Sequence, residues 1–433
     1  MSPAASPIVV GNALAALATL DPVEGIPDRP VDRGCRLTSG ALRALVGAEP
    51  WASRVREHVL VASAPAGMPA GASARPASLR PIDAVVAVPA RDESARIARC
   101  LDACADSIDE SGRAVELLVL VNGSTDDTCA RALAWSARRR RPLTLVDVAF
   151  LPGWAHAGAA RGLALALAAL DVPPATALLT TDADTVPALD WVRRNLEHLD
   201  AGVALVCGAI GVDPGEVARL PPASSDCADV AERYQRATRE IESHLDPDPW
   251  NRWPHHGTSG GASLAIRRTT LEAVGGVPPI PCGEGRALAA RVRGAGARVR
   301  YADDVVVTAS CRLYGRAPGG MADTIRRRLF EVDPLCDAEF RTARRVADDA
   351  RLAAALRRCW SRRDARVPLL LAHGLPSDRA AAIAGIDDVS DALQACRASG
   401  SAARLRVSTL RAELPVLLAL LARAREEAST CRA

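Results

Sequence analysis

Short apolar runs alternate with helical patterns in the first half of the chain. Four of these runs have the length and composition of strands buried on both faces of a sheet. They are residues 83–90, 115–121, 143–150 and 176–181. The segments between them place apolar residues at the spacing of amphipathic helices, and these are 92–104, 124–140 and 155–170. Strands that alternate with helices predict an α/β fold, with a mainly parallel sheet covered by helices on both faces.

The pattern changes on either side of this region. Residues 1 to about 60 predict irregular structure and short helices, and residues 62–81 have the Pro, Ala, Gly and Ser content of a linker. From about residue 330 the chain is wholly helical in pattern, with amphipathic runs at 337–360, 377–399 and 407–427. We therefore expect an N-terminal extension with a linker (1–80), an α/β domain (81–330) and an all-α C-terminal region (331–433). The C-terminal helices are expected to serve packing or oligomerisation.

The charge balance argues against one class of partner. The 433 residues carry a net charge of +3, whereas a dedicated nucleic-acid-binding domain is usually far more basic. All 54 basic residues are arginine, a composition typical of GC-rich bacterial genomes. The run Arg138 to Arg141 is interpreted as the C-terminus of a helix, where the dipole favours cations. Peripheral contact with an anionic membrane is the alternative interpretation of this run.

The cysteines and the hydropathy of the chain indicate the cellular compartment in which the protein is expected. The 12 cysteines form no CxxC motif and no Cys/His cluster at zinc spacing, so we interpret them as reduced, small apolar residues. The start of the chain lacks the positive region of a signal peptide. The apolar segment 414–424 is shorter than the ~20 residues of a membrane span. A soluble cytoplasmic protein is expected.

Two aspartates follow the last of the four apolar runs. Asp182 and Asp184 are separated only by Ala183. Ligands bind at the carboxyl ends of the strands in open α/β sheets, so this is where a site is expected. Two neighbouring carboxylates repel each other unless a positive group lies between them, and their oxygens suit Mg²⁺ or Mn²⁺. The alternative is that they only stabilise the start of a helix near Pro187.

Six segments, in this order and spacing, resemble the family 2 glycosyltransferases. They are 86–101, 116–128, 158–166, 178–192, 261–278 and 283–301, and the resemblance extends over roughly 82–330. It implies a GT-A fold, that of the nucleotide-diphospho-sugar transferases, with a Rossmann-like, mixed and mainly parallel sheet. It also implies metal-dependent transfer of a sugar from a nucleotide-diphosphate donor to a hydroxyl-bearing acceptor. The Q-x-x-R-W sequence of processive polymer synthases is absent, so a single transfer is expected.

The resemblance also implies which residues bind the donor. The turn after the first strand would hold the base and ribose through Pro89, Ala90, Arg91 and Glu93. Asn122 would contact the base. Val121 stands where the family often has an aspartate that contacts the base, so the resemblance selects no particular base.

The remaining donor residues concern the phosphates and the metal. Arg161 would approach the phosphates or the ribose, since a guanidinium suits phosphate geometry. Asp184 would be the direct ligand of a Mg²⁺ or Mn²⁺ cofactor. Asp182 would contact the ribose, or the metal through water. Arg312 and Arg316 are expected on a glycine-rich loop that closes over the diphosphate.

Two departures from the family pattern concern catalysis. The family usually has a Glu-Asp pair whose aspartate is the general base, but here Glu284 is followed by Gly285. Glu284 is therefore the candidate general base. The alternatives are that the base is absent and that Glu284 only stabilises the first turn of a helix. The histidine that completes the metal shell in many members is replaced in a region that contains Thr308 and Ser310. His255 and His256 are expected either on a loop surface or at the acceptor side of the site.

The departures motivate an alternative function. A degenerate, non-catalytic protein would bind a nucleotide sugar, or act as a scaffold through its C-terminal helices. A nucleotidyltransferase is disfavoured because residues 88–94 lack the glycine-rich basic loop typical of that class.

Overall fold

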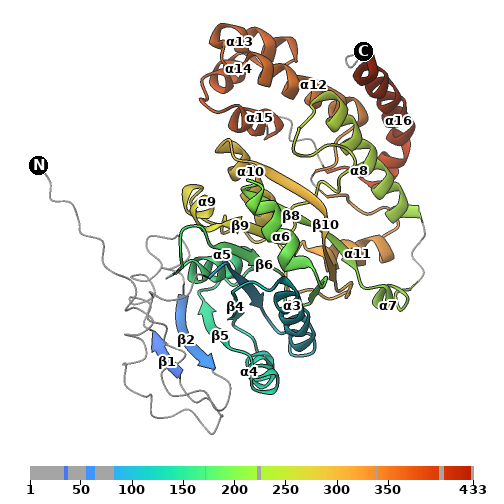
Figure 1. Ribbon diagram of the computed structural model, residues 1–433. Helices are drawn as coiled ribbons and strands as arrows, with labels where there is room; N and C mark the ends of the chain where they lie inside the picture. Colours follow the sequence, from blue (N-terminus) through green and yellow to red (C-terminus); the bar gives the residue numbers. More distant parts are fainter. Residues whose placement is uncertain are drawn as a thin grey trace, which may run out of the picture.

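The computed structural model describes residues 34–37, 55–63, 82–170, 172–221, 226–337, 339–398 and 404–430 (Figure 1). A ten-stranded sheet forms the centre of this part of the chain, in the order β1-β2-β5-β4-β3-β6-β9-β8-β10-β7. The strands are β1 (Gly34–Leu37), β2 (Val55–Ser63), β3 (Ala84–Ala90), β4 (Val115–Asn122), β5 (Leu143–Phe150), β6 (Ala177–Thr180), β7 (Thr185–Pro187), β8 (Leu205–Val212), β9 (Leu264–Arg267) and β10 (Val299–Ala309).

The sheet is mixed and mainly parallel. Strands β5, β4, β3 and β6 are parallel neighbours, and β10 is parallel to β8. The antiparallel β9 lies between β6 and β8, so β8 and β10 run in the same direction as β6. The outer strands β7 and β2 pair antiparallel with β10 and β5. The expected Rossmann-like α/β architecture, a mixed and mainly parallel sheet flanked by helices, is confirmed.

Helices cover both faces of the sheet. On one face lie α3 (Ile97–Ser111), α4 (Thr128–Arg139) and α6 (Trp191–Asp200), whose apolar sides enter a core that contains Leu101, Trp135 and Trp191. On the other face lie α5 (Ala157–Ala168), α9 (Arg268–Ala273) and α10 (Glu284–Gly294), around Leu163 and Leu288. Small residues let α5 approach closely, and a Cβ on Gly158 would lie 2.2 Å from the carbonyl oxygen of Ile280.

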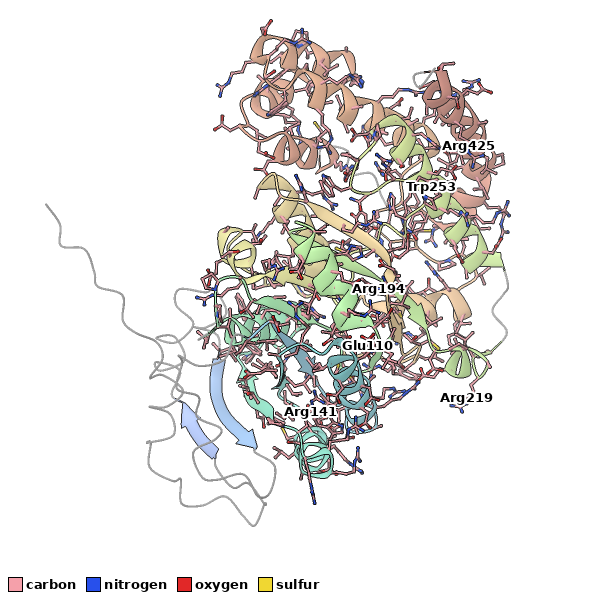
Figure 2. All side chains as sticks on the ribbon, in the orientation of Figure 1. Glu110, Arg141, Arg194, Arg219, Trp253 and Arg425 are labelled. Carbon is pink, nitrogen blue, oxygen red and sulfur yellow. The ribbon has the colours of Figure 1, made fainter. Side chains whose placement is uncertain are left out.

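The remaining helices lie outside the two layers that cover the sheet (Figure 1). They are α7 (Pro214–Val217), α8 (Asp226–Leu245), α11 (Met321–Phe330), α12 (Ala343–Cys359), α13 (Arg363–Ala372), α14 (Ser377–Ala384), α15 (Val389–Ala398) and α16 (Val407–Thr430). Helices α8, α12 and α16 share one apolar core, and α12 to α15 share another. Arg425 of α16 donates to Glu240 of α8 at 2.7 Å (Figure 2). No helix in the described ranges combines the length and apolarity needed to cross a membrane.

Several local expectations were wrong. The region expected to be irregular or helical supplies β1 and β2, which join the sheet beside β5. The linker predicted over 62–81 lies outside the described residues, apart from its first two positions, which end β2. The run 377–399 forms two helices, α14 and α15, because the chain breaks helical geometry after Ala384. Pro187 ends β7, and the next helix begins only at Trp191.

The arginine run forms the C-terminus of a helix, as predicted. α4 ends at Arg139, and Arg140 has left-handed backbone geometry. Arg141, labelled in Figure 2, donates to both carboxylate oxygens of Asp109 on α3, at 2.9 and 3.0 Å. These contacts attach the end of α4 to α3.

Candidate functional site

The carboxyl ends of four strands lie along one edge of the sheet. Because β3, β4, β6 and β10 run in the same direction, the turns that follow them meet there. These turns carry the residues expected from the sequence: Pro89, Ala90, Arg91 and Glu93 after or at the end of β3, Asn122 at the end of β4, Asp182 and Asp184 after β6, and Arg312 after β10. Two arginines organise the charges at this edge.

Arg161 lies on α5 and is almost completely buried, with 2% of its surface exposed. Its three nitrogens donate to Glu284 Oε1 at 3.0 Å, Thr180 Oγ1 at 2.9 Å and Asp182 Oδ1 at 2.5 Å. Burial lowers the pKa of Arg161, but the two carboxylates outweigh this effect, so its pKa lies above the usual range. Arg161 therefore stays charged and fixes the orientation of both carboxylates.

Arg312 neutralises the second pair of carboxylates. Its guanidinium donates to both oxygens of Glu93, at 2.7 and 2.5 Å, and lies 3.0 Å from Asp184 Oδ2. Burial and the nearby charge of Asp182 raise the pKa of Asp184 to about 7, against the opposing effect of Arg312. Asp182 and Asp184 are thus neighbours in sequence that pair with different arginines, which reduces the repulsion between them.

The turns after β3 and β4 are locked to each other. Asp92 has a φ of 50°, and its backbone N–H donates to Ser124 Oγ at 2.9 Å. Asp92 Oδ1 accepts from the N–H of Thr125 at 2.7 Å, and Asp126 Oδ2 accepts from the N–H of Ser94 at 3.0 Å. Ser124 accepts from this neighbouring turn, and α4 begins only at Thr128, with no side-chain hydrogen bond from its cap residue Asp127. The turns after β3 and β4, which are expected to bind the nucleotide-sugar donor, are therefore joined into a single rigid unit.

Three more residues that the sequence predicts to bind the nucleotide sugar lie on this unit or contact it. Arg91 donates to the carbonyl oxygen of Ala155 at 2.9 Å, and Arg316 donates to that of Asp92 at 2.8 Å. Asn122 is buried, and its Oδ1 has no hydrogen-bond partner in the structure. A buried amide oxygen without a partner is uncommon in proteins, and this one is available to accept a hydrogen bond from a ligand.

Close packing explains why a glycine stands at position 285. A Cβ at this position would lie 2.3 Å from the carbonyl oxygen of Ser259 and 3.1 Å from the nitrogen of Gly261. Gly261 is confined in turn, because its own Cβ would lie 2.4 Å from Arg161 Nη2. An aspartate does not fit at position 285 in this backbone, so the second acidic position of the family pattern is excluded by packing.

The histidines have structural contacts. His156 caps α5, with Nδ1 accepting from the N–H of Ala159 at 3.2 Å. The ring nitrogens of His256 lie 2.7 Å from Thr258 Oγ1 and 3.1 Å from the carbonyl oxygen of Cys207, and burial is the main cause that lowers its pKa to about 4. His255 stacks on Tyr301 with ring centroids 5.3 Å apart. These contacts hold the start of α5 and the loop that precedes β9. None of them involves Asp182 or Asp184.

Sequence reasoning missed a group beside Asp184. A small cavity of about 250 Å³ adjoins it and is lined in part by Arg96, Arg99 and Glu216. Glu216 accepts from Ser310 Oγ at 2.6 Å and from the N–H of Cys311 at 2.9 Å, which fixes the turn that leads to Arg312. No motif surrounds Glu216 in the sequence, and only the fold brings it to this turn.

Comparison with solved structures gave matches of low identity. A mannosyltransferase from Pyrobaculum calidifontis, in complex with GDP-Man and Mn²⁺, is 18% identical over 82% of this chain and 76% of that chain, with a TM-score of 0.39. Glucosyl-3-phosphoglycerate synthase from Mycobacterium tuberculosis, in complex with Mn²⁺, UDP and phosphoglyceric acid, is 22% identical over 58% and 78%, with a TM-score of 0.37. TarS from S. aureus, in complex with UDP-GlcNAc, is 14% identical over 73% and 90%, with a TM-score of 0.40.

Comparison of the sequence with curated proteins gave no match. The model of the family "Glycosyl transferase family 2" matches residues 85–270. This range begins in β3, ends in α9 and contains Arg161 and both aspartates. The part of the α/β domain formed by residues 85–270 is therefore similar to the glycosyltransferases of family 2.

Proposed function

We propose that this domain transfers a sugar from a nucleotide-diphosphate donor to a hydroxyl group of an acceptor, with the help of Mg²⁺ or Mn²⁺. One observation carries the proposal: a buried amide oxygen, two aspartates and two charged guanidinium groups meet where the parallel strands end. A nucleotide sugar presents a base, a ribose and a diphosphate, which require these kinds of partner. Both the hydroxyl acceptor and the need for a metal ion belong to this proposal.

The donor would lie along the rigid unit formed by the first two turns. Pro89, Ala90, Arg91 and Glu93 would border the base and ribose. Asn122 Oδ1 would accept a hydrogen bond from the base, which would satisfy its buried oxygen. This arrangement requires no change in the backbone of the two turns, because hydrogen bonds between them already hold it.

The residues present fit a cation that shares its ligands with the donor. Among the described residues, no group of three or more His, Cys, Asp or Glu side chains could hold a metal by itself. Asp182 and Asp184 each have one oxygen next to an arginine, and their other oxygens, Asp182 Oδ2 and Asp184 Oδ1, accept no hydrogen bond from the described residues. Mg²⁺ keeps several waters and commonly binds through one or two carboxylates plus substrate phosphates. Bound here, the cation would act as a Lewis acid and neutralise charge on the leaving diphosphate.

The chain's own residues would place the groups that react. Arg161 would hold Asp182 in position, and Arg312 would add positive charge beside the diphosphate. Glu284 Oε1 is bound to Arg161, whereas Oε2 accepts no hydrogen bond from the described residues. We assign the proton of the acceptor hydroxyl to Glu284 Oε2, since Gly285 offers no carboxylate.

Calorimetric binding of UDP and GDP, with and without Mn²⁺, tests the proposal. Wild type is expected to bind one of them with Mn²⁺, and Asp184→Asn is expected to lose this binding. Asp348→Asn, on the exposed side of α12, is the matched control and should bind as wild type does. Absence of binding by UDP, GDP, and the thymidine and cytidine diphosphates would refute a nucleotide-sugar site.

Donor hydrolysis separates the proposal from its alternative. A transferase is expected to pass the sugar slowly to water when no acceptor is present. Metal-dependent donor binding without hydrolysis, and without transfer to any acceptor offered, would instead indicate a non-catalytic nucleotide-sugar-binding protein.

A further inference from the structure

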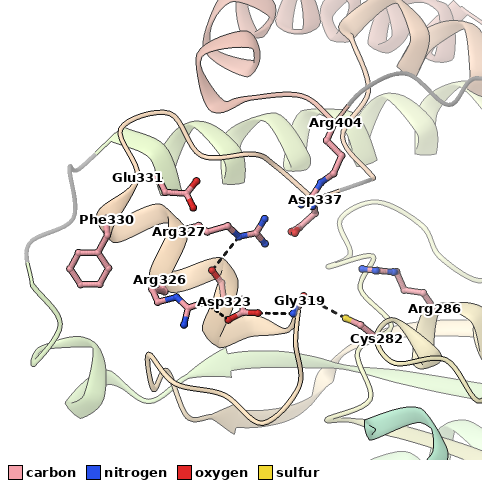
Figure 3. A pocket seen from close by; sticks show the side chains of 10 residues that line it. All are labelled: Cys282, Arg286, Gly319, Asp323, Arg326, Arg327, Phe330, Glu331, Asp337 and Arg404. Atoms are coloured by element: carbon pink, nitrogen blue, oxygen red, sulfur yellow. Dashed lines mark hydrogen bonds and ion pairs between the residues drawn. The ribbon is translucent and has the colours of Figure 1, made fainter. Parts of the chain in front are cut away.

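A second and larger cavity lies next to the candidate site. Its volume is about 680 Å³, and it lies between the start of α10, the helix α11 and the segment around Asp337 and Arg404 (Figure 3). Figure 3 shows Arg327 extending from α11 into this space, with Arg286 and Arg404 on the opposite side. The sequence analysis assigned no role to these residues.

The cavity contains guanidinium groups without carboxylate partners. Arg286 pairs with Glu339 at 2.9 Å and Arg326 with Asp323 at 2.8 Å. Arg327 has only weak contacts, such as Nη2 to Thr324 Oγ1 at 3.4 Å, and it forms no ion pair with any residue the structure describes. Such a guanidinium matches the geometry of a phosphate or carboxylate.

Arg404 also lacks a carboxylate partner within the described ranges. Its Nε and Nη2 both donate to the carbonyl oxygen of Cys336, at 2.8 and 2.6 Å. These two bonds hold its guanidinium at the wall of the cavity and leave Nη1 for a ligand. Arg327 and Arg404 therefore approach the space from two different segments, as the two halves of an anion-binding site would.

Other lining groups suit hydroxyls and a sugar ring. Glu331 and Asp337 face the cavity and form no ion pair with the described part of the chain, so their oxygens are available to accept from hydroxyl groups. Phe330 lines the same space and is 61% exposed, which leaves its ring free to pack against the C–H face of a sugar or polyol. A purely apolar ligand would leave these charges without partners.

The cavity adjoins the proposed transfer centre. Cys282 and Arg286 line it and lie two residues before and after Glu284. Gly319 also lines it and belongs to the loop that carries Arg312, and Cys282 Sγ donates to the carbonyl oxygen of Gly319 at 3.5 Å (Figure 3). The two segments that hold the site thus continue into the wall of the cavity.

We propose that this cavity binds the acceptor, and that the acceptor is a hydroxyl compound with a phosphate or carboxylate group, such as a polyol phosphate or sugar phosphate. This inference rests on the proposed function. The anionic group binds Arg327 and Arg404, and the hydroxyls bind Glu331 and Asp337. In the transfer, the acceptor oxygen bonds to the anomeric carbon of the donor and its proton passes to Glu284. The bond from that carbon to the diphosphate breaks, and the nucleoside diphosphate leaves with the electron pair.

Binding without the donor tests the cavity separately from the donor site. The probes are inorganic phosphate and glycerol 3-phosphate, measured by calorimetry on the full chain. Wild type is expected to bind at least one of them saturably. Arg327→Gln is expected to weaken this binding at least about tenfold, the loss expected for one charge-assisted hydrogen bond. Arg328→Gln, the next residue on α11 and not part of the cavity wall, is the control and should bind as wild type does.

The outcomes separate this proposal from the donor site. Donor binding by wild type without saturable binding of any anionic probe would overturn the acceptor assignment and leave the proposed function intact. Equal losses in Arg327→Gln and Arg328→Gln would also overturn it, since they would indicate non-specific charge attraction. Should Arg327→Gln fail to fold by circular dichroism, Arg404→Gln on the opposite side of the cavity takes its place with the same expectation.

A vesicle assay distinguishes the source of the anionic group. Sedimentation with phosphatidylcholine vesicles containing phosphatidylglycerol, with and without glycerol 3-phosphate as competitor, shows whether the cavity takes a lipid headgroup. Vesicle binding that Arg327→Gln loses and Arg328→Gln keeps would assign the headgroup of a lipid. Binding of the free compound without vesicle binding would assign a soluble acceptor. Failure of the nucleotide experiment, with these results positive, would overturn the proposed function and with it the acceptor role, and would leave only an anion-binding cavity.

Discussion

Replacement of Gly285 by alanine tests whether packing excludes a side chain from the start of α10. The added methyl group would lie 2.3 Å from the carbonyl oxygen of Ser259, while ordinary van der Waals contact begins at 3.4 Å. The two backbones would therefore have to separate by about 1 Å. Both are held: α10 is anchored by its core residues, and the segment of Gly261 lies against the buried Arg161.

The expected cost follows from this geometry. Overpacking of a well-packed site costs about 1–3 kcal/mol, and the higher helix propensity of alanine offsets up to about 1 kcal/mol of it. We expect Gly285→Ala to lower the free energy of unfolding by about 1–2 kcal/mol, and Gly285→Asp to lower it further by adding a charge to a buried turn. Gly294→Ala is the control in the same helix, because its Cβ would meet only the end of the Asp391 side chain, at 3.0 Å. That side chain can rotate, so the control should be neutral or slightly stabilising.

Urea unfolding followed by tryptophan fluorescence measures these differences, since Trp135 and Trp191 are buried on one face of the sheet. Donor hydrolysis by Gly285→Asp gives a second measurement. Equal midpoints for Gly285→Ala and Gly294→Ala would refute the steric argument. A rise in hydrolysis or transfer by Gly285→Asp would refute it as well, because the family's second carboxylate would then have found room.

Three further predictions concern the charged groups. The pKa of Asp184 is raised to about 7 in the folded chain, above its value of 3.8 in the unfolded chain. The folded chain therefore binds the proton of Asp184 more tightly. The stability that this proton adds is fully present below pH 3.8 and is lost as the pH rises through about 7. Urea unfolding of Asp184→Asn and wild type at pH 5 to pH 8 measures this effect. The free energy of unfolding of the variant, minus that of wild type, should rise with pH by up to about 1.4 kcal/mol for each pH unit below 7 and level off above it. A constant difference would contradict the raised pKa. Because a metal binds the ionised carboxylate, calorimetry should show Mn²⁺-dependent nucleotide binding weakening about tenfold per pH unit below about 7, and equal affinity at pH 5.5 and pH 8 would exclude Asp184 as a ligand. Arg161→Met leaves Glu284 and Asp182 without their arginine, and its free energy of unfolding should fall by about 3–5 kcal/mol, whereas a loss below about 1 kcal/mol would show that the two carboxylates find other partners.

The sheet and the edge that carries the site were predictable because their signals are local. A continuous apolar run is sufficient to predict a strand buried on both faces, and β3, β4, β5 and β6 lie within one or two residues of their expected positions. Since parallel strands end at one edge, the location of Asp182 and Asp184 followed from their place after β6.

The rest depends on contacts between distant residues. β2 mixes charged and apolar residues and is a strand because it pairs with β5, so its own pattern did not predict it. Arg312 and Glu93 pair although 219 positions separate them. The exclusion of a side chain at Gly285 arises from Ser259, on another segment. Local periodicity contains no information about such pairs, so the residues were predicted but their partners were not.

The position of α8 has a consequence for shortened forms of the protein. α8 lies in the chain between β8 and β9, inside the region that matches the family model, yet its apolar side packs on α12 and α16. Tyr234 is fully buried there and donates to the carbonyl oxygen of Arg341 at 2.8 Å. A fragment cut at residue 330 would keep the sheet but expose this apolar strip to water, so it is expected to aggregate. A fragment for crystallisation or screening therefore has to retain α16, although α16 lies far from the proposed donor residues in the sequence.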